Sequence, residues 1–195
     1  MRKTLLVLLT LLLALSVHEL PAASSRDKVY LLKKKQDEKC RLSMMRIYEH
    51  LKAYHAKKKA FPKLNNYSGL KELVKNGALP GDFVCDAYRG KKNKKLKDMT
   101  EKTNPFLYFG GINYAEAQRV CPNIPLLCDK PNSRHLNVLL ADGNIISVDF
   151  KRMKRKISNC KDIVNLLNEL YGYPADILEA LRVKAGLMDK QLSGR

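Results

Sequence analysis

The segment from Asn137 to Asp149 constrains the fold of this chain more than any other stretch. Two runs rich in Val, Leu and Ile flank the pair Asp142-Gly143. An Asp-Gly pair suits the positive-φ positions of a tight hairpin turn. The pattern therefore predicts a strand, a turn at Asp142 and Gly143, and a second strand that returns antiparallel to the first.

Other short segments have weaker β or loop signals. Phe106–Phe109, ended by Gly110-Gly111, is typical of a buried strand, and Asp82–Cys85 is expected to be a brief extended segment. The Lys-rich stretch 89–104 predicts an exposed loop. The Pro- and Asn-rich stretch 121–135 predicts irregular structure.

Helical periodicity appears on both sides of these segments. The first helix is expected to begin near Cys40 and to end in the Lys57–Lys59 run before Phe61-Pro62, because the residue before a proline avoids helical geometry. One face of this helix carries apolar residues at helical spacing: Cys40, Met44, Ile47, Leu51 and Tyr54.

Three more helices are expected. One covers Ser68–Asn76, with Leu70, Leu73 and Val74 inward and Gly77 at its C-terminal end. The second is capped by Asn159 and has Asp162 in its first turn, and Gly172 ends it. The third begins at Pro174. Their apolar stripes are Ile163, Leu166, Leu167 and Leu170, and then Ile177, Leu178, Leu181 and Ala185.

These elements predict an α+β fold, in which an N-terminal helix packs on a small antiparallel sheet and a helical extension follows. The chain has 195 residues, 45% of them hydrophobic and 29% charged. That balance suits one globular unit and excludes whole-chain disorder and a multi-span membrane protein.

The N-terminus has the pattern of a secretory signal peptide. Met1-Arg2-Lys3 is basic, Thr4–Val17 is an apolar run of 14 residues, and small residues follow at Ala22-Ala23. The run is shorter than the about 20 residues of a membrane-spanning helix. We expect residues 1–23 to be cleaved and the protein to be exported. A cut after Ser16 and retention of the apolar run as an N-terminal anchor are the alternatives. Residues 24–39 form a charged lead-in.

Export makes disulfides possible for the cysteines of the mature chain. Five cysteines allow at most two bridges and leave one thiol over, and the sequence alone does not fix the pairing. We expect Cys121–Cys128, which closes a small Pro-stiffened loop, and Cys40–Cys85, with Cys160 free. The alternative is that several of the five are buried thiols.

The formal net charge of +18 is concentrated in runs. The candidate basic surface consists of Lys91, Lys92, Lys94, Lys95, Lys97, Lys151, Arg152, Lys154, Arg155 and Lys156. No aromatic residues are interleaved for base stacking, and no nucleic-acid-binding motif is present, so nucleic acid is not an expected partner. Anionic envelope polymers and lipid headgroups are the candidate ligands, beside a merely solvated basic surface.

No catalytic motif stands out. The sequence has no HExxH, GxSxG, P-loop or GxGxxG. His50 and His55 are five residues apart and do not share a helix face well. A Cys–His pair could be assembled around His135, but no spacing favours it. We therefore expect no enzymatic activity and no cofactor.

The block from Cys40 to Asp149 resembles the soluble, periplasmic part of type II secretion-like pseudopilins. The likeness is carried by an ordered series of segments: Cys40–Tyr54 before Phe61-Pro62, Leu70–Leu73, Gly77–Cys85, Tyr108–Gly111, Pro125–Pro131, His135 and Val138–Gly143. Prepilins also have a Gly-Phe-Thr-Leu-Ile-Glu-like processing site before a long apolar helix. This sequence contains neither, so the resemblance does not extend to the part that builds a fibre.

The resemblance implies a pseudopilin-like domain over residues 40–150, followed by a basic linker and helical extension over residues 151–195. It implies a non-catalytic structural or interaction role, with envelope or secretion-type proteins as partners and no membrane span in the mature protein. Family pseudopilins can bind calcium near their last strands, where Asp129, His135 and Asp142 lie here. That ligand set is incomplete, so we expect no metal site.

Overall fold

The computed structural model describes residues 25–85, 100–131, 135–148 and 156–194. The chain divides into two compact units, Met1–Lys34 and Lys35–Arg195. In chain order the elements are α2 (Ser25–Lys58), α3 (Asn66–Lys75), the 3₁₀ turn η1 (Pro80–Phe83), β1 (Phe106–Tyr108), α4 (Tyr114–Val120), β2 (Pro125–Asp129), β3 (Leu136–Leu140), β4 (Ile145–Val148), α5 (Cys160–Tyr171) and α6 (Ala175–Ser193). The expected α+β class is confirmed. The helices α5 and α6 belong to the same compact unit as the sheet.

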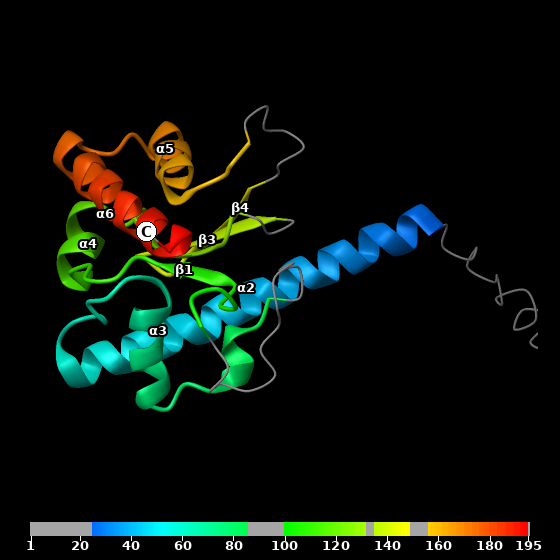
Figure 1. The fold of residues 1–195 in the computed structure, drawn as a ribbon, viewed down its shortest axis with the longest axis horizontal. Helices are drawn as coiled ribbons and strands as arrows, with labels where there is room; N and C mark the ends of the chain where they lie inside the picture. Colours follow the sequence, from blue (N-terminus) through cyan, green and yellow to red (C-terminus); the bar gives the residue numbers. More distant parts are fainter. Residues whose placement is uncertain (1–24, 86–99, 132–134, 149–155, 195) are drawn as a thin grey trace, which may run out of the picture. The chain divides into compact units, whose positions relative to one another are not determined.

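The sheet is a four-stranded antiparallel meander with the order β1-β2-β3-β4 (Figure 1). Consecutive strands are neighbours throughout. In the pairing of β1 with β2, Leu107 lies opposite Cys128. The predicted hairpin is confirmed as β3 and β4, in which Val138 lies opposite Ile146.

The hairpin turn uses its Asp-Gly pair differently from the sequence-based expectation. Gly143 has a φ of +90°, but Asp142 is not among the residues with positive φ. The Gly143 amide donates to the Leu140 carbonyl at 3.0 Å, and the Asn144 amide donates to the Asp142 carboxylate at 2.9 Å. One positive-φ residue, Gly143, and two hydrogen bonds from Asn144 to the Asp142 carboxylate therefore close the turn.

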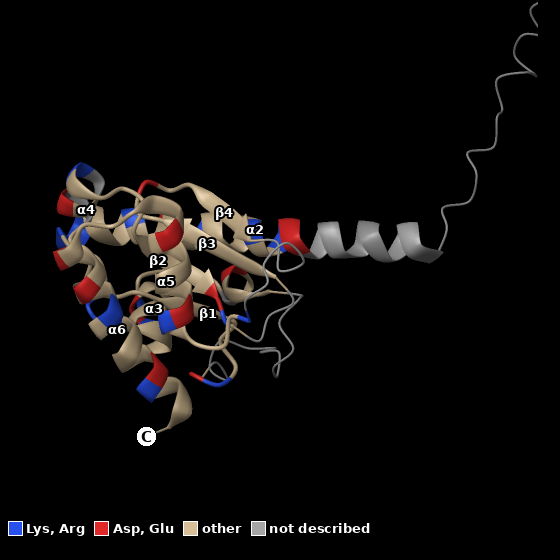
Figure 2. Cartoon of the chain, turned by 90° about the horizontal axis from the view of Figure 1, so that it is seen from above, with Lys and Arg blue, Asp and Glu red and all other residues tan. Residues whose placement is uncertain are grey.

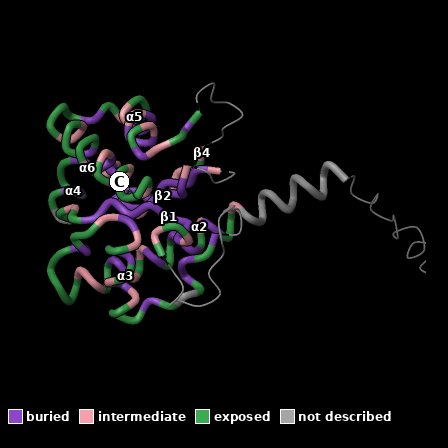
Figure 3. The backbone as a smooth tube through the Cα atoms, in the orientation of Figure 1, coloured by how far each residue is buried: buried purple, intermediate pink, exposed green. Residues whose placement is uncertain are grey.

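Helices cover both faces of the sheet. Within the unit Lys35–Arg195, α2 and α3 lie on one side of the strands and α5 and α6 lie on the other (Figure 1). Every residue of β1, β2 and β3 is buried (Figure 3). Because both faces are covered, these strands are apolar runs rather than alternations of apolar and polar residues.

Helix α2 uses the apolar face that the sequence predicts. Cys40, Met44, Ile47 and Leu51 are fully buried, and Tyr54 packs against the core. The helix begins at Ser25, well before the expected start near Cys40. The charged lead-in is therefore helical from Ser25. It contains no Gly or Pro, and it is rich in Lys, which has high helix propensity.

Helix α3 packs closely on the first strand at Gly69. A β-carbon at this position would contact the Leu64 carbonyl and would lie 2.6 Å from the Tyr108 ring. Only glycine fits there. Leu70 and Leu73 are buried as predicted, and Gly77 follows the helix with a φ of +104°.

The two C-terminal helices follow the predicted boundaries. Asn159 caps α5 by accepting from the Asp162 amide at 2.8 Å, and Gly172 ends it in the left-handed conformation. Pro174 precedes the first turn of α6, in which Leu181 and Ala185 are buried. The prediction that Leu170 lies in the buried stripe of α5 is wrong, because this residue is 58% exposed.

Two local predictions are wrong, and one helix was not predicted. Residues 121–135 contain the strand β2, because pairing with β1 and β3 orders a segment whose local sequence favours loops. Residues 80–83 form a 3₁₀ turn, so that only Val84 and Cys85 of the expected extended segment follow it. Helix α4, capped by the Asn113 side chain, was not predicted.

The contact between α2 and the hairpin turn makes Gly143 a testable position. Tyr48 of α2 donates to the Ala141 carbonyl at 3.3 Å, and a β-carbon on Gly143 would lie 2.7 Å from the Tyr48 ring. We expect Gly143→Ala to lower the free energy of unfolding by about 1–3 kcal/mol, since it adds a clash to an unfavourable φ. Urea unfolding measures the loss. Gly81→Ala is the matched control, because nothing lies within 4 Å of its β-carbon position. Equal stability of the two variants would contradict the prediction.

Candidate functional site

A disulfide joins α2 to the segment that follows η1. Cys40 and Cys85 are bonded, with a Cα–Cα distance of 4.8 Å, and are 0% and 2% exposed. This expected pairing is confirmed. The bridge closes a loop with a sequence separation of 45 residues. In the chain-entropy account, a loop of this size stabilises the folded state by about 4 kcal/mol.

The other expected bridge, Cys121–Cys128, is not formed. Cys121 follows the end of α4, whereas Cys128 lies inside β2, where the extended backbone carries it about 10 Å beyond Pro125. The loop that would close this bridge is therefore a paired strand. Both are free, buried thiols, and so is Cys160, for which this state was expected.

The free thiols in the core are poor nucleophiles. Burial raises the pKa of Cys128 and of Cys160, and the nearby carboxylate of Asp189 raises both further. Protonated thiols are unreactive. The Asp189 side chain has a structural role, because it accepts from the Cys160 amide at 2.7 Å at the start of α5.

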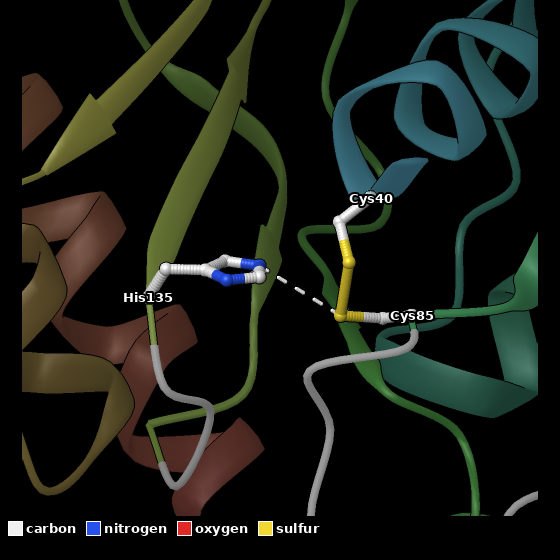
Figure 4. A group of neighbouring side chains, drawn as sticks. All are labelled: Cys40, Cys85 and His135. Carbon is white, nitrogen blue, oxygen red and sulfur yellow. Dashed lines mark hydrogen bonds between the residues drawn. A yellow bond between two sulfur atoms is a disulfide. The ribbon is translucent and has the colours of Figure 1, made fainter. Parts of the chain in front are cut away.

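His135 lies against the disulfide, as Figure 4 shows. Its Nε2 atom is 3.8 Å from Sγ of Cys85. The two sulfur atoms and a ring nitrogen of His135 all lie within 4.8 Å of one another. The histidine immediately precedes β3, so the sheet and the α2 cross-link meet at this point.

Asp129, the last residue of β2, completes the contact with His135. Its Oδ2 atom lies 3.2 Å from Nε2 of His135. The same oxygen accepts a hydrogen bond from the backbone N–H of Asn137 at 2.8 Å. The side chain is fully buried, and Oδ1 has no hydrogen-bond partner. Burial raises the pKa of Asp129, which the hydrogen bond and charge of His135 partly offset.

Asp37 of α2 lies on the other side of the imidazole. Its Oδ1 atom is 3.9 Å from Nδ1 of His135 and accepts from the Asn137 side chain at 2.9 Å. Ser147 of β4 in turn donates to the Asn137 side chain at 2.6 Å. We refer to Cys40, Cys85, His135, Asp129 and Asp37 as the buried centre. The two cysteines and Asp129 are buried, and the side chains of His135 and Asp37 are 17% and 34% exposed. Burial lowers the pKa of His135, but the hydrogen bond to Asp129 and the charges of both carboxylates outweigh it, so the net shift is upward.

The structure shows which of the candidate histidines and acidic residues lie close together. It brings Asp129 and His135 together, but Asp142 instead binds Asn144 in the hairpin turn, at 2.7 Å. His50 pairs with Asp82 at 2.9 Å. Sequence reasoning missed Asp37, because its partner Asn137 is 100 residues away and no local motif marks the pair.

Most of the candidate basic surface lies outside the described residues. This applies to Lys91, Lys92, Lys94, Lys95, Lys97, Lys151, Arg152, Lys154 and Arg155. Lys156 is described and is exposed. The expected signal peptide, residues 1–23, also lies outside the described part of the chain.

Among the described residues, no helix combines the length and the apolar character of a membrane span. A scan against protein-family models, a search of curated proteins and a search of solved structures each found no match to this chain. The centre is therefore interpreted from its own chemistry.

The buried centre predicts a specific pH dependence of stability. His135 has a raised pKa in the folded protein relative to the ordinary 6.5. Its contribution to stability is thus fully present below about pH 6.5 and is lost as the pH rises through the raised value. The pKa of Asp129 is also raised in the folded protein, from the ordinary value of 3.8. Its contribution to stability is therefore lost over a pH range that starts near 3.8, below the range for His135.

We expect the melting temperature to fall between about pH 6 and about pH 8, and His135→Gln to flatten that slope. Calorimetry over this range provides the measurement. His50→Gln is the matched control, because His50 pairs with Asp82 outside the centre. An unchanged slope in His135→Gln would contradict the assignment.

Proposed function

We propose that this protein is an exported, non-catalytic structural or protein-interaction module that resembles the soluble domain of type II secretion pseudopilins. The observation that carries the proposal is the cross-link of α2 to the body of the domain by the buried Cys40–Cys85 disulfide. A core disulfide suits a protein that works outside the reducing cytoplasm. The basic, apolar N-terminal segment supports the same location.

The order of elements supports the comparison with pseudopilins. The helix α2 is followed by a shorter helix and then by an antiparallel meander that ends in the Asp142-Gly143 hairpin. This is the order of the segments that carry the sequence resemblance. A rigid helix held on a sheet offers preformed surfaces, which favour docking because little ordering is needed on binding.

The burial of the centre supports a role without catalysis. Cys40 and Asp129 are fully buried, and Cys85 is 2% exposed. A substrate of ordinary size would have no access to the sulfur atoms or to the carboxylate in this arrangement.

In-cell crosslinking of the mature protein, followed by mass spectrometry, tests the proposal. We expect secretion-type or pilus-like subunits to be recovered, and we expect recovery to persist in moderate salt, because apolar docking is not screened. Signal cleavage at Ala23 is read from the same sample. Recovery of the protein alone, or with cytoplasmic proteins only, would contradict the proposal.

A second function has support from the charge distribution. The runs 91–97 and 151–156 contain Lys and Arg and no Asp or Glu. On the described helices α4 to α6, by contrast, basic and acidic residues are interspersed (Figure 2). A basic module for anionic envelope polymers or lipid headgroups would therefore use these two runs.

Salt dependence tests this alternative. We expect binding to vesicles that contain phosphatidylglycerol to fall by about tenfold or more between low and moderate ionic strength, since screening shortens the reach of the charges. Replacing Lys91, Lys92 and Lys94 by Gln should reduce binding at low salt. Replacing Lys57–Lys59 by Gln is the control for net charge. Salt-insensitive binding, or equal loss in both variants, would contradict a site in these runs.

A further inference from the structure

The buried centre has the donor atoms of a metal site. Thiolate sulfur and imidazole nitrogen are the ligands that Zn²⁺ prefers, at about 2.3 Å and 2.0 Å. Around a tetrahedral ion, a sulfur and a nitrogen ligand at these lengths are about 3.5 Å apart, and two sulfur ligands are about 3.8 Å apart. The 3.8 Å between Nε2 of His135 and Sγ of Cys85 is within about 0.3 Å of the sulfur–nitrogen spacing. The two sulfur atoms are too close together to be separate ligands, because they are bonded.

Asp129 offers an oxygen atom beside the ring nitrogen of His135 that faces Cys85. Its Oδ2 atom is 3.2 Å from Nε2 of His135, near the spacing of an oxygen and a nitrogen around one ion. Its Oδ1 atom is buried without a hydrogen-bond partner. A buried carboxylate oxygen that lacks a partner costs free energy. A bound cation would offset that cost.

Asp37 lies near Nδ1 of His135 at an ion-pair distance that is too long for a hydrogen bond, so its support of the imidazole is electrostatic. If Nε2 binds the ion, Nδ1 has the proton, and Oδ1 of Asp37 lies 3.9 Å from Nδ1. A carboxylate behind the imidazole fixes the tautomer and raises the basicity of the ligand nitrogen. Asn137 in turn holds Asp37 through a hydrogen bond of 2.9 Å.

We propose that the centre holds either the Cys40–Cys85 disulfide or, once that bond is reduced, a zinc-class divalent ion. A small-molecule dithiol supplies two electrons and two protons, which cleave the S–S bond to two thiols while the reductant becomes a disulfide. On binding the ion, both thiols release their protons to water. Cys40, Cys85 and His135 are the ligands, Asp129 fills the fourth position, and Asp37 is a positioning residue.

Burial favours a small ion over a protein thiol as the ligand of the reduced centre. Cys40 is 0% exposed and Cys85 is 2% exposed. Thiol–disulfide exchange with another protein would need direct access to one of these sulfur atoms. An ion needs only a path of its own size, and it restores the link between α2 and the segment after η1 that reduction removes.

The experiment compares the full chain with its disulfide intact and after reduction by a phosphine that is removed under anaerobic conditions. Both forms are titrated with Co²⁺, whose absorption reports thiolate ligation and tetrahedral geometry, and then with Zn²⁺ against a chromophoric chelator. We expect the reduced protein to bind a single ion with sulfur-to-cobalt charge-transfer bands, and the disulfide form to bind none. Zinc should also raise the melting temperature of the reduced protein only.

Variants separate this site from the other thiols. We expect Asp37→Asn to weaken binding by about 10- to 100-fold, as loss of an outer-shell partner does, and His135→Gln to weaken it at least as much. His50→Gln and Cys160→Ser are the matched controls and should bind normally. If His135→Gln fails to fold, Asp129→Asn and Asp37→Asn still test the site, and their circular dichroism in the disulfide form confirms folding.

Three results would overturn the proposal. The first is a reduced protein that binds no ion, and the second is tight binding that His135→Gln and Asp37→Asn leave unchanged. The third is binding that is lost in Cys160→Ser, which would assign the ion to the other thiols. None of these results bears on whether the protein docks to secretion-type subunits, so the two proposals fail separately.

Discussion

The cover of helices on both faces of the small sheet is the constraint on which the rest of this structure depends. A four-stranded sheet with short strands cannot form a stable core by itself. Here α2 and α3 bury one face and α5 and α6 bury the other. Burial of the apolar residues of β1, β2 and β3 on both sides supplies the main driving force for folding. The C-terminal helices are therefore part of the core rather than an addition to it.

This arrangement leaves polar groups where the strand ends meet α2, and the buried centre satisfies most of them. Asp129 ends β2 and is fully buried, and His135 precedes β3 with its side chain 17% exposed. They pair with each other, and Asn137, Asp37 and Ser147 extend the network to α2 and β4. Removing one partner from such a network leaves the others unpaired in the core, which is costly. The disulfide fixes α2 at the same point.

The two proposals describe different states of one feature. As a disulfide, the centre is a covalent cross-link between α2 and the body of the domain, which suits an exported module that presents fixed surfaces to other proteins. With the S–S bond open, the same sulfur atoms and the same imidazole become ligands. Asp129 has a distinct place in each state, first as the partner of His135 and then as a fourth ligand.

The sequence by itself determined the local features of this protein. Helical spacing identified the buried face of α2, Asn159 and Gly172 marked the ends of α5, and Asp142-Gly143 marked the hairpin, because each signal acts within a few residues. The Cys40–Cys85 pairing was also expected, although the sequence alone did not fix it. Only the tertiary structure decided that residues 125–129 form a strand, that Cys121 and Cys128 stay apart, and that Asp37 and Asp129 flank His135. Those outcomes depend on contacts between residues far apart in the chain. The free energy of such contacts is set by packing and burial rather than by the neighbouring residues in the sequence.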